Sequence, residues 1–212
     1  MILRILGDSI LIWRRMKRRI LYVAMKPRFH ACGKRLKFCP EDSEFTYQNI
    51  SIGDDVHIGQ RAFFMSSESK IVIGNQVMFG PNVTIIGGNH NTSVVGSSMY
   101  SVRDKKPYDD EPVIINDDVL VGSNSTILKG VTIGRGSIVA AGSIVTRSYP
   151  RYAIIGGAPA SLIRWRWSID KVIEHEAKLY PLVNRCSPEK LRQERVEFER
   201  KNRSRNDHAK NC

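Results

Sequence analysis

The stretch VLVGSNSTILKGVTIGRGSIVAAGSIV, residues 119–145, decides the fold. An aliphatic residue recurs in it at every sixth position: Val121, Ile127, Ile133, Val139 and Val145. A helix would place apolar residues three and four apart and a hairpin strand at every second residue, so neither period explains a spacing of six. A coil with three short flat faces does explain it, because each face turns one aliphatic side chain inward. The stretch therefore predicts a solenoid of stacked coils.

The same spacing extends back to residue 52. The repeat positions are Ile52, Ile58, Phe64, Ile73, Phe79, Ile85, Ile115, Val121, Ile127, Ile133, Val139 and Val145. Small or β-branched residues recur between these positions. Gly, Asn and Asp also recur there, and their backbones tolerate tight corners. A β-sandwich with regular turns is the alternative, and twelve matching positions argue against it.

Two irregularities interrupt the repeat. A phase slip between Phe64 and Ile73 predicts a small loop around residues 65–70. A longer break over Asn89–Pro112 has no repeat character and predicts an excursion loop, where functional residues tend to lie. We therefore divide the chain into an N-terminal helical or capping segment, a repeat solenoid with an excursion loop at about 89–112, and a C-terminal helix with a basic tail. These three parts are residues 1–49, 50–163 and 164–212.

Charge is distributed unevenly along the 212 residues. The net charge is +12, but residues 38–163 hold 9 Lys and Arg against 12 Asp and Glu. The basic excess therefore belongs to the two ends, and a nucleic-acid-binding core is not expected. The four cysteines are scattered without a CxxC pair, which indicates neither a zinc site nor a disulfide framework and fits a reducing cytoplasm.

The two ends are expected to be helical. Near the N-terminus an apolar stripe precedes a basic cluster, the opposite order from a secretory signal, and no apolar run is long enough to cross a bilayer. The stripe consists of Ile2, Leu3, Leu6, Ile10 and Trp13. It predicts either packing on the body or a neighbouring subunit, which we favour, or a peripheral contact with an anionic membrane. Residues 168–180 also show helical spacing.

Four segments resemble the maltose/galactoside and xenobiotic O-acetyltransferases of the hexapeptide-repeat family. They are residues 119–123 (VLVGS), 130–134 (GVTIG), 140–147 (AAGSIVTR) and 155–160 (IGGAPA). The resemblance implies an all-β solenoid, a left-handed parallel β-helix, with helical segments at both ends. It also implies a homotrimer that binds acetyl-CoA between neighbouring subunits, so that each site takes residues from two chains.

His90 is the candidate catalytic residue. It is the one histidine of the excursion, in GGNHN at residues 87–91, and the resemblance places the family's catalytic histidine there. A neutral imidazole can accept a proton near neutral pH, as the transfer of an acetyl group to a hydroxyl or amine requires. A loop histidine taken alone is more often simply solvated, and the resemblance reverses those odds. No metal is required.

The resemblance also assigns residues to acetyl-CoA and, with less weight, to the acceptor. The acetyl-CoA candidates are Ser123, Ala141, Gly142, Thr146, Arg147 and Arg164, and the acceptor candidates are Gln60 and Glu68. Leu120 stands where many relatives have Trp. Loop residues at the entrance are Tyr100, Lys105, Tyr108 and Asp109, each as readily explained by simple exposure.

These observations predict an acetyl-CoA-dependent O-acetyltransferase acting on a sugar hydroxyl, in the cytoplasm or at the inner face of the membrane, with surface-polysaccharide synthesis as a candidate setting. Two other enzymes fit the same residues, an N-acetyltransferase of a nucleotide-linked amino sugar and an antibiotic acetyltransferase. A β-helix that binds without catalysis is the remaining alternative.

Overall fold

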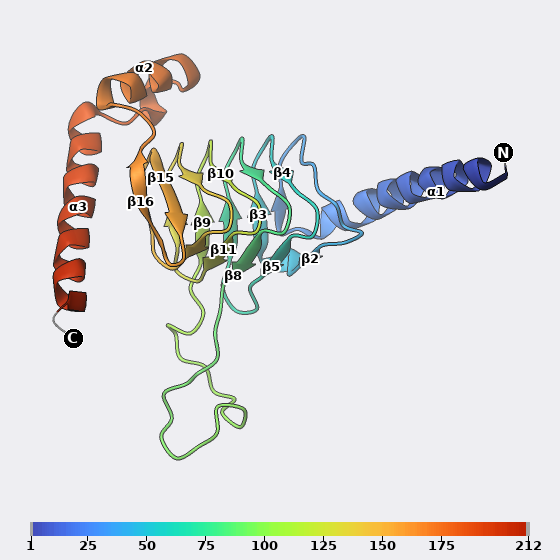
Figure 1. Ribbon diagram of the computed structural model, residues 1–212, viewed down its shortest axis with the longest axis horizontal. Helices are drawn as coiled ribbons and strands as arrows, with labels where there is room; N and C mark the ends of the chain where they lie inside the picture. Colours follow the sequence, from blue (N-terminus) through green and yellow to red (C-terminus); the bar gives the residue numbers. More distant parts are fainter. Residues whose placement is uncertain (1, 211–212) are drawn as a thin grey trace.

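Most of the chain is wound into a left-handed parallel β-helix (Figure 1). The computed structural model describes residues 2–210, and for Ile2, Leu3, Ile5 and residues 203–210 it describes the backbone only. Sheet A contains β1 (Ala31–Cys32), β3 (Ile50–Ile52), β6 (Ile71–Ile73), β9 (Val113–Ile115) and β12 (Thr132–Ile133). Sheet B contains β4 (His57–Ile58), β7 (Met78–Phe79), β10 (Leu120–Val121), β13 (Ile138–Val139), β15 (Ala153–Gly157) and β16 (Ala160–Trp165). Sheet C contains β2 (Glu44–Phe45), β5 (Phe63–Met65), β8 (Thr84–Ile86), β11 (Thr126–Leu128) and β14 (Ile144–Val145).

The six-residue repeat forms the core. None of its twelve positions is more than 4% exposed. Equivalent residues stack in register from coil to coil, as Phe79, Val121, Val139 and Ile155 do in sheet B. Each coil therefore buries its apolar side chains against its neighbours, which confirms the predicted solenoid.

The corners use residues that tolerate a left-handed backbone. In the last coils Asn124, Gly130, Gly136 and Gly142 follow one another at six-residue intervals with φ of 58°, 72°, 71° and 71°. Such a conformation is unstrained for Gly and accessible to Asn. The short break after Phe64 is a turn leading into β6, as the phase slip predicted.

The coils begin earlier than the repeat is visible in the sequence. The first coil starts at β1 and is filled by large rings, among them Phe29, Phe38, Phe45 and Tyr47, with centroids of contacting rings 4.8–5.9 Å apart. The 3-10 turns η1 (Lys26–Arg28) and η2 (Tyr47–Asn49) flank this cluster. It closes the N-terminal end of the solenoid, where no further coil covers the core.

The C-terminal end is closed by α2 (Ile169–Leu179), η3 (Leu182–Asn184) and α3 (Pro188–Lys210). Glu176 of α2 is 1% exposed and accepts hydrogen bonds from the Tyr152 hydroxyl (2.9 Å) and the Cys186 amide (2.6 Å). Arg135 lies 3.6 Å from the same carboxylate and compensates its charge. Burial, and then the bond to Glu176, raises the pKa of Tyr152 above its usual range.

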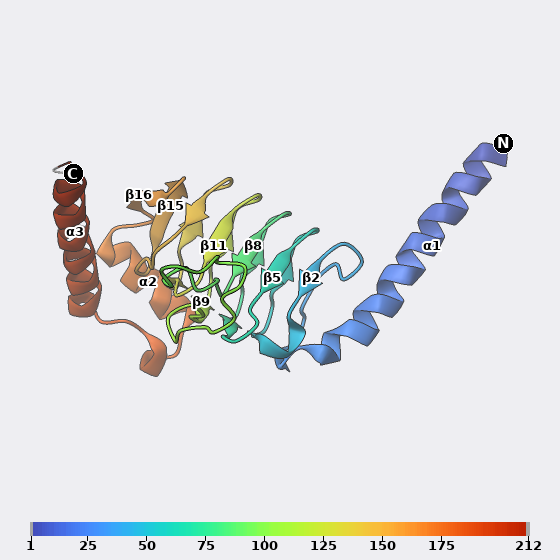
Figure 2. The ribbon, with the colours of Figure 1, turned by 90° about the horizontal axis from the view of Figure 1, so that it is seen from below.

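The N-terminal helix α1 (Ile2–Met25) projects away from the other end of the coils, which it contacts through its C-terminal half (Figures 1 and 2). Leu6, Ile10 and Trp13 of the predicted apolar stripe are 58%, 52% and 62% exposed, and the side chains of Ile2 and Leu3 lie outside the described ones. The stripe therefore does not pack on the body of its own chain, and contact with a subunit or membrane stays a prediction. No described helix is both long and apolar enough to span a bilayer.

Candidate active site

The excursion leaves the β-helix after β8 and returns at β9, projecting far from the coils (Figure 1). Its two ends pair at a short neck, where the Glu111 amide donates to the Gly87 carbonyl (3.1 Å) and the Asn89 amide to the Asp109 carbonyl (2.7 Å). This break is where the sequence predicted the excursion. These bonds fix the backbone immediately before residue 90.

Two buried polar side chains hold the neck together. Asn91, 5% exposed, donates from Nδ2 to the Asp104 carbonyl (3.0 Å) and accepts from the Ser93 amide (3.0 Å). Asp109, 6% exposed, accepts from the Lys106 amide (2.7 Å). Because buried polar groups with partners resist opening, the base of the excursion is ordered although its tip is exposed.

His90 lies on this neck with its side chain exposed. Its amide donates to Oδ1 of Asn89 (3.1 Å), and among the described residues no hydrogen bond holds its imidazole nitrogens. It lines a cavity of about 340 Å³ together with Ser67, Lys105 and Asp110. The imidazole is thus free to meet an acceptor entering this cavity.

Asp110 is a site residue that the sequence did not single out. Its side chain is 7% exposed, and Oδ2 bonds Nζ of Lys105 at 2.6 Å. Oδ1 is buried and has no hydrogen-bond partner among the described residues. Gly88 makes room for it, since a Cβ there would lie 1.7 Å from Oδ1. Its neighbour Asp109, proposed for the entrance, is instead buried in the neck, where it accepts a hydrogen bond from the Lys106 amide.

The other entrance candidates have different positions. Lys105 lines the cavity beside His90, whereas Tyr100 and Tyr108 are 84% and 55% exposed and do not line it. Glu68 lies nearby, lining a second cavity of about 340 Å³ that shares Lys105 and Asp110. Charged groups of both signs therefore surround the approach to His90.

Four predicted residues gather at the corner between sheets B and C, which we call the B–C corner: Gln60, Ser123, Ala141 and Gly142. Backbone bonds stack them coil upon coil, with the Asn82 amide donating to the Gln60 carbonyl (2.8 Å) and the Gly142 amide to the Ser123 carbonyl (2.9 Å). Ala141 and Gly142 are exposed, and a Cβ at Gly142 would meet open space. The corner is therefore open to an extended ligand.

An apolar strip adjoins the B–C corner on the outer face of sheet B. Leu120 pairs in register with Met78, and their exposed fractions are 37% and 51%. Ile138 continues the row on the next coil. This strip gives the corner an apolar wall.

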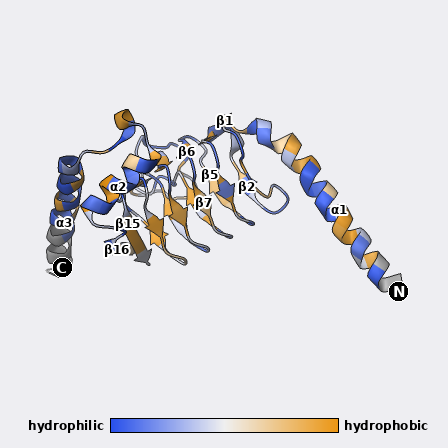
Figure 3. Ribbon diagram, turned by 90° about the horizontal axis from the view of Figure 1, so that it is seen from above, coloured by the Kyte–Doolittle hydropathy of each residue, from blue (hydrophilic) through white to orange (hydrophobic). Residues whose placement is uncertain are grey.

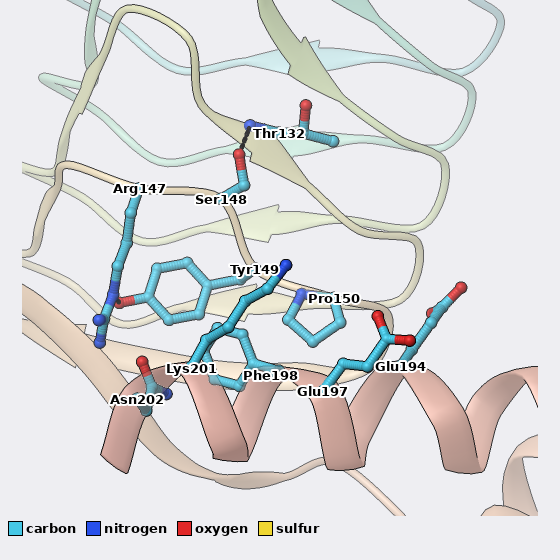
Figure 4. Close-up of a pocket in the computed structure, with 10 residues that line it drawn as sticks. All are labelled: Thr132, Arg147, Ser148, Tyr149, Pro150, Glu194, Glu197, Phe198, Lys201 and Asn202. Carbon is cyan, nitrogen blue, oxygen red and sulfur yellow. Dashed lines mark hydrogen bonds between the residues drawn. The ribbon is translucent and has the colours of Figure 1, made fainter. Parts of the chain in front are cut away.

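Thr146 and Arg147 lie elsewhere, at the corner between sheets C and A. Arg147 donates from Nε to the Tyr149 hydroxyl (3.1 Å), and its guanidinium lies 5.5 Å and 5.9 Å from the ring centroids of Tyr149 and Phe198. Figure 4 shows these groups between the last coil and α3, lining a cavity of about 450 Å³ with Lys201. The aromatic partners position Arg147 and leave guanidinium donors for a ligand.

The remaining arginine candidates differ in their contacts. Arg164 is exposed on β16, with one bond from Nη1 to the Trp165 carbonyl (3.3 Å). Arg166, two residues further on, is bound to Asp118 (2.8 Å) and the Gly136 carbonyl (3.0 Å). These bonds attach the segment between β16 and α2 to the coils.

The predicted residues thus form two groups on one chain. His90 and Glu68 belong to the corner between sheets C and A, whereas Ser123 and Ala141 belong to the B–C corner, at the other edge of sheet C. The sequence could have predicted that the candidates divide between two corners. Three hexads complete one coil, so every third hexad lies on the same face. Across residues 2–210, no cluster of three or more His, Cys, Asp or Glu side chains is suited to a metal ion.

Comparison with known proteins agrees with the fold. The family described as the hexapeptide repeat of succinyl-transferase matches residues 112–147. A 2,3,4,5-tetrahydropyridine-2,6-dicarboxylate N-acetyltransferase of Staphylococcus aureus is 52% identical over 59 residues, 28% of this chain and 25% of that protein. The chain thus spans about a quarter of the length of the curated relatives it matches.

Solved structures match over more of the chain. A hexapeptide-repeat acetyltransferase of Vibrio cholerae, also solved with acetyl-CoA, is 28% identical with a TM-score of 0.61, covering 71% of this chain and 82% of that one. A galactoside acetyltransferase in complex with coenzyme A is 26% identical with a TM-score of 0.56, covering 69% and 70%.

Fold and matches together define the class of protein: a left-handed β-helix built from hexapeptide repeats. Within that class the chain is similar in structure to hexapeptide-repeat acetyltransferases, which confirms the resemblance predicted from its sequence.

Proposed function

We propose that this chain is an acetyl-CoA-dependent acetyltransferase with His90 as its general base. The observation that carries the proposal is the exposed imidazole of His90 on an ordered neck, beside a cavity, in a fold shared with acetyltransferases. Solved relatives in complex with acetyl-CoA and coenzyme A support the choice of donor.

In the proposed reaction, the His90 imidazole removes the proton of an acceptor hydroxyl as its oxygen attacks the thioester carbonyl of acetyl-CoA. Donors at the B–C corner, with Ser123 nearby, stabilise the oxyanion of the tetrahedral intermediate. When the intermediate collapses, the carbon–sulfur bond breaks and the imidazolium returns its proton to the CoA thiolate. Every step is acid–base or nucleophilic, so no metal is required.

The B–C corner is the proposed path for the pantetheine arm. Ala141 and Gly142 offer exposed backbone without bulky side chains, and Leu120 and Met78 provide an apolar wall beside it. Thr146 and Arg147, which lie at the same corner as His90, and Arg164 on β16 are proposed for the nucleotide end, where an arginine fork suits phosphate oxygens. In the trimer proposed below, Thr146 and Arg147 would come from the chain that supplies His90.

The active unit is proposed to be a homotrimer. One chain carries His90 and the CoA path at opposite edges of sheet C, so that a neighbouring chain would complete each site. Closed cyclic symmetry then gives three equivalent sites.

The acceptor is proposed to be a sugar hydroxyl, with cytoplasmic surface-polysaccharide synthesis as the setting. Gln60 and Glu68 are proposed contacts, and Oδ1 of Asp110 is available to accept from an acceptor hydroxyl. The second candidate is N-acetylation, favoured by the 52% identity to an N-acetyltransferase over 59 residues. The same base and cavity serve either nucleophile.

The proposal is tested by His90→Ala, with His30→Ala as a matched control at an exposed histidine on the first coil. Because a general base contributes about 10²–10⁴-fold, we expect a loss of acetyl transfer of that order with CoA binding unchanged. His30→Ala should retain full activity. Unchanged turnover in His90→Ala would refute the mechanism.

The acceptor is decided by measuring CoA release with three sets of compounds: sugars, nucleotide-linked amino sugars and antibiotics. A signal with sugar hydroxyls supports O-acetylation. A strong signal with a nucleotide amine and none with hydroxyls would establish N-acetylation instead.

A further inference from the structure

Helix α1 meets the rest of the chain along one side. The Tyr22 hydroxyl donates to the Leu36 carbonyl (2.6 Å), and its ring lies 5.2 Å from that of Phe38. Further along the helix, Lys17 and Arg18 lie 3.6 Å and 3.8 Å from the carboxylate of Glu41. These contacts fix which face of α1 points toward the body.

The opposite face of α1 is apolar and uncovered. At about 100° per residue, Ile12, Trp13, Met16, Ile20 and Val23 fall within one arc of roughly 100° that begins about 80° around the helix from Tyr22. Their exposed fractions are 57%, 62%, 53%, 62% and 65%. In Figure 3 hydrophobic and hydrophilic colours alternate along this helix as it extends from the coils. A monomeric soluble protein rarely leaves such a continuous apolar strip in water.

Cations accompany the apolar strip. Helix α1 carries six basic residues and one acidic residue, Asp8: the basic ones are Arg4, Arg14, Arg15, Lys17, Arg18 and Arg19. Two like-charged helices would repel if they paired through this strip, which disfavours a second copy of the chain as its occupant. An anionic lipid surface has the complementary charge and an apolar interior beneath it.

We propose that α1 lies in the plane of an anionic membrane surface, with the strip of Ile12, Trp13, Met16, Ile20 and Val23 inserted at the level where headgroups meet acyl chains. Arg15 and Arg19, which border the strip, bind lipid phosphates and carboxylates. Trp13 suits this depth, because its ring is apolar and its N–H needs a polar partner. The helix lies on the membrane and does not cross it. The inference is independent of the chemistry proposed for His90.

The protein with all 212 residues should float with vesicles of phosphatidylcholine containing about 30% phosphatidylglycerol, and only weakly with phosphatidylcholine alone, because one amphipathic helix depends on both apolar insertion and charge. The test compares Met16→Glu with Leu11→Glu. These side chains are 53% and 52% exposed, but Leu11 lies on the side of Tyr22 and Met16 on the opposite side. Both substitutions add one negative charge to the same helix.

We expect Met16→Glu to lower the vesicle-bound fraction at least tenfold and Leu11→Glu less than threefold, with circular dichroism unchanged in both. Equal effects of the two substitutions would overturn the proposal, because charge alone would then explain binding. So would failure of the wild type to float with anionic vesicles. An oligomer in sedimentation that Met16→Glu dissociates, without vesicle binding, would overturn it in favour of self-association.

Discussion

The coils from β9 to β14 and the excursion between β8 and β9 are neighbours in the chain, yet they are stabilised in different ways. The coils repeat one pattern, and Val121, Ile127 and Ile133 are fully buried in it. The excursion has no pattern, exposes most of its side chains and depends on Asn91 and Asp109 at its neck. Stability and chemistry are therefore assigned to different segments, and a change in one need not disturb the other.

The largest effect on stability is expected within the coils. Ile127→Ala removes a side chain that is 0% exposed between two coils, and should lower the free energy of unfolding by about 2–5 kcal/mol. Thr126→Ala changes the preceding residue of β11, whose side chain faces outward, and should change the free energy of unfolding by less than about 0.5 kcal/mol. Urea denaturation measures the free energy of unfolding of both variants. Equal effects would show that the inward row is not the core.

A smaller and local effect is expected at the neck. Asn91→Ala deletes the bonds to the Asp104 carbonyl and the Ser93 amide, leaving buried groups unpaired at a cost of about 1–3 kcal/mol. Because the coils do not depend on the neck, hydrogen exchange should accelerate in residues 89–111 only. Acceleration throughout the coils would contradict the separation of the two regions.

The smallest effect on stability is expected at the tip of the excursion. Replacing residues 94–102 by a short Gly-Ser linker keeps the neck, and should change the free energy of unfolding by less than about 0.5 kcal/mol, since loop closure depends weakly on length. CoA binding should also persist. A cooperative loss of structure in urea would show that the tip stabilises the coils.

The sequence predicted the coils well because the repeat constrains both interior and corner residues at every turn. It did not reveal the first coil, where Phe38, Phe45 and Tyr47 replace the aliphatic row. Nor did it reveal the buried pairing of Glu176 with Arg135 and Tyr152, since residues so far apart meet only in the folded cap.

The site was predicted less completely. The resemblance selected His90, but a single chain's pattern gives no sign that Asn91 is buried or that Asp110 lines the cavity in place of Asp109. Those positions depend on how the two strands of the neck pair, and the hexad period ends before the neck begins.

The central claim is that His90 of one chain acts on acetyl-CoA held at the B–C corner of its neighbour. It is tested by mixing two inactive variants, His90→Ala and Ala141→Trp, the latter placing a bulky ring on the exposed corner. Ala177→Trp, at an exposed alanine of α2, controls for the added ring and should stay active.

In randomly mixed trimers, each with two chains of one variant and one of the other, one of the three shared sites is intact. The account therefore predicts recovery of about a quarter of wild-type acetyl transfer from a 1:1 mixture refolded or expressed together. If each site were built within one chain, every site would carry one defect. A mixture no more active than either variant alone would contradict the account.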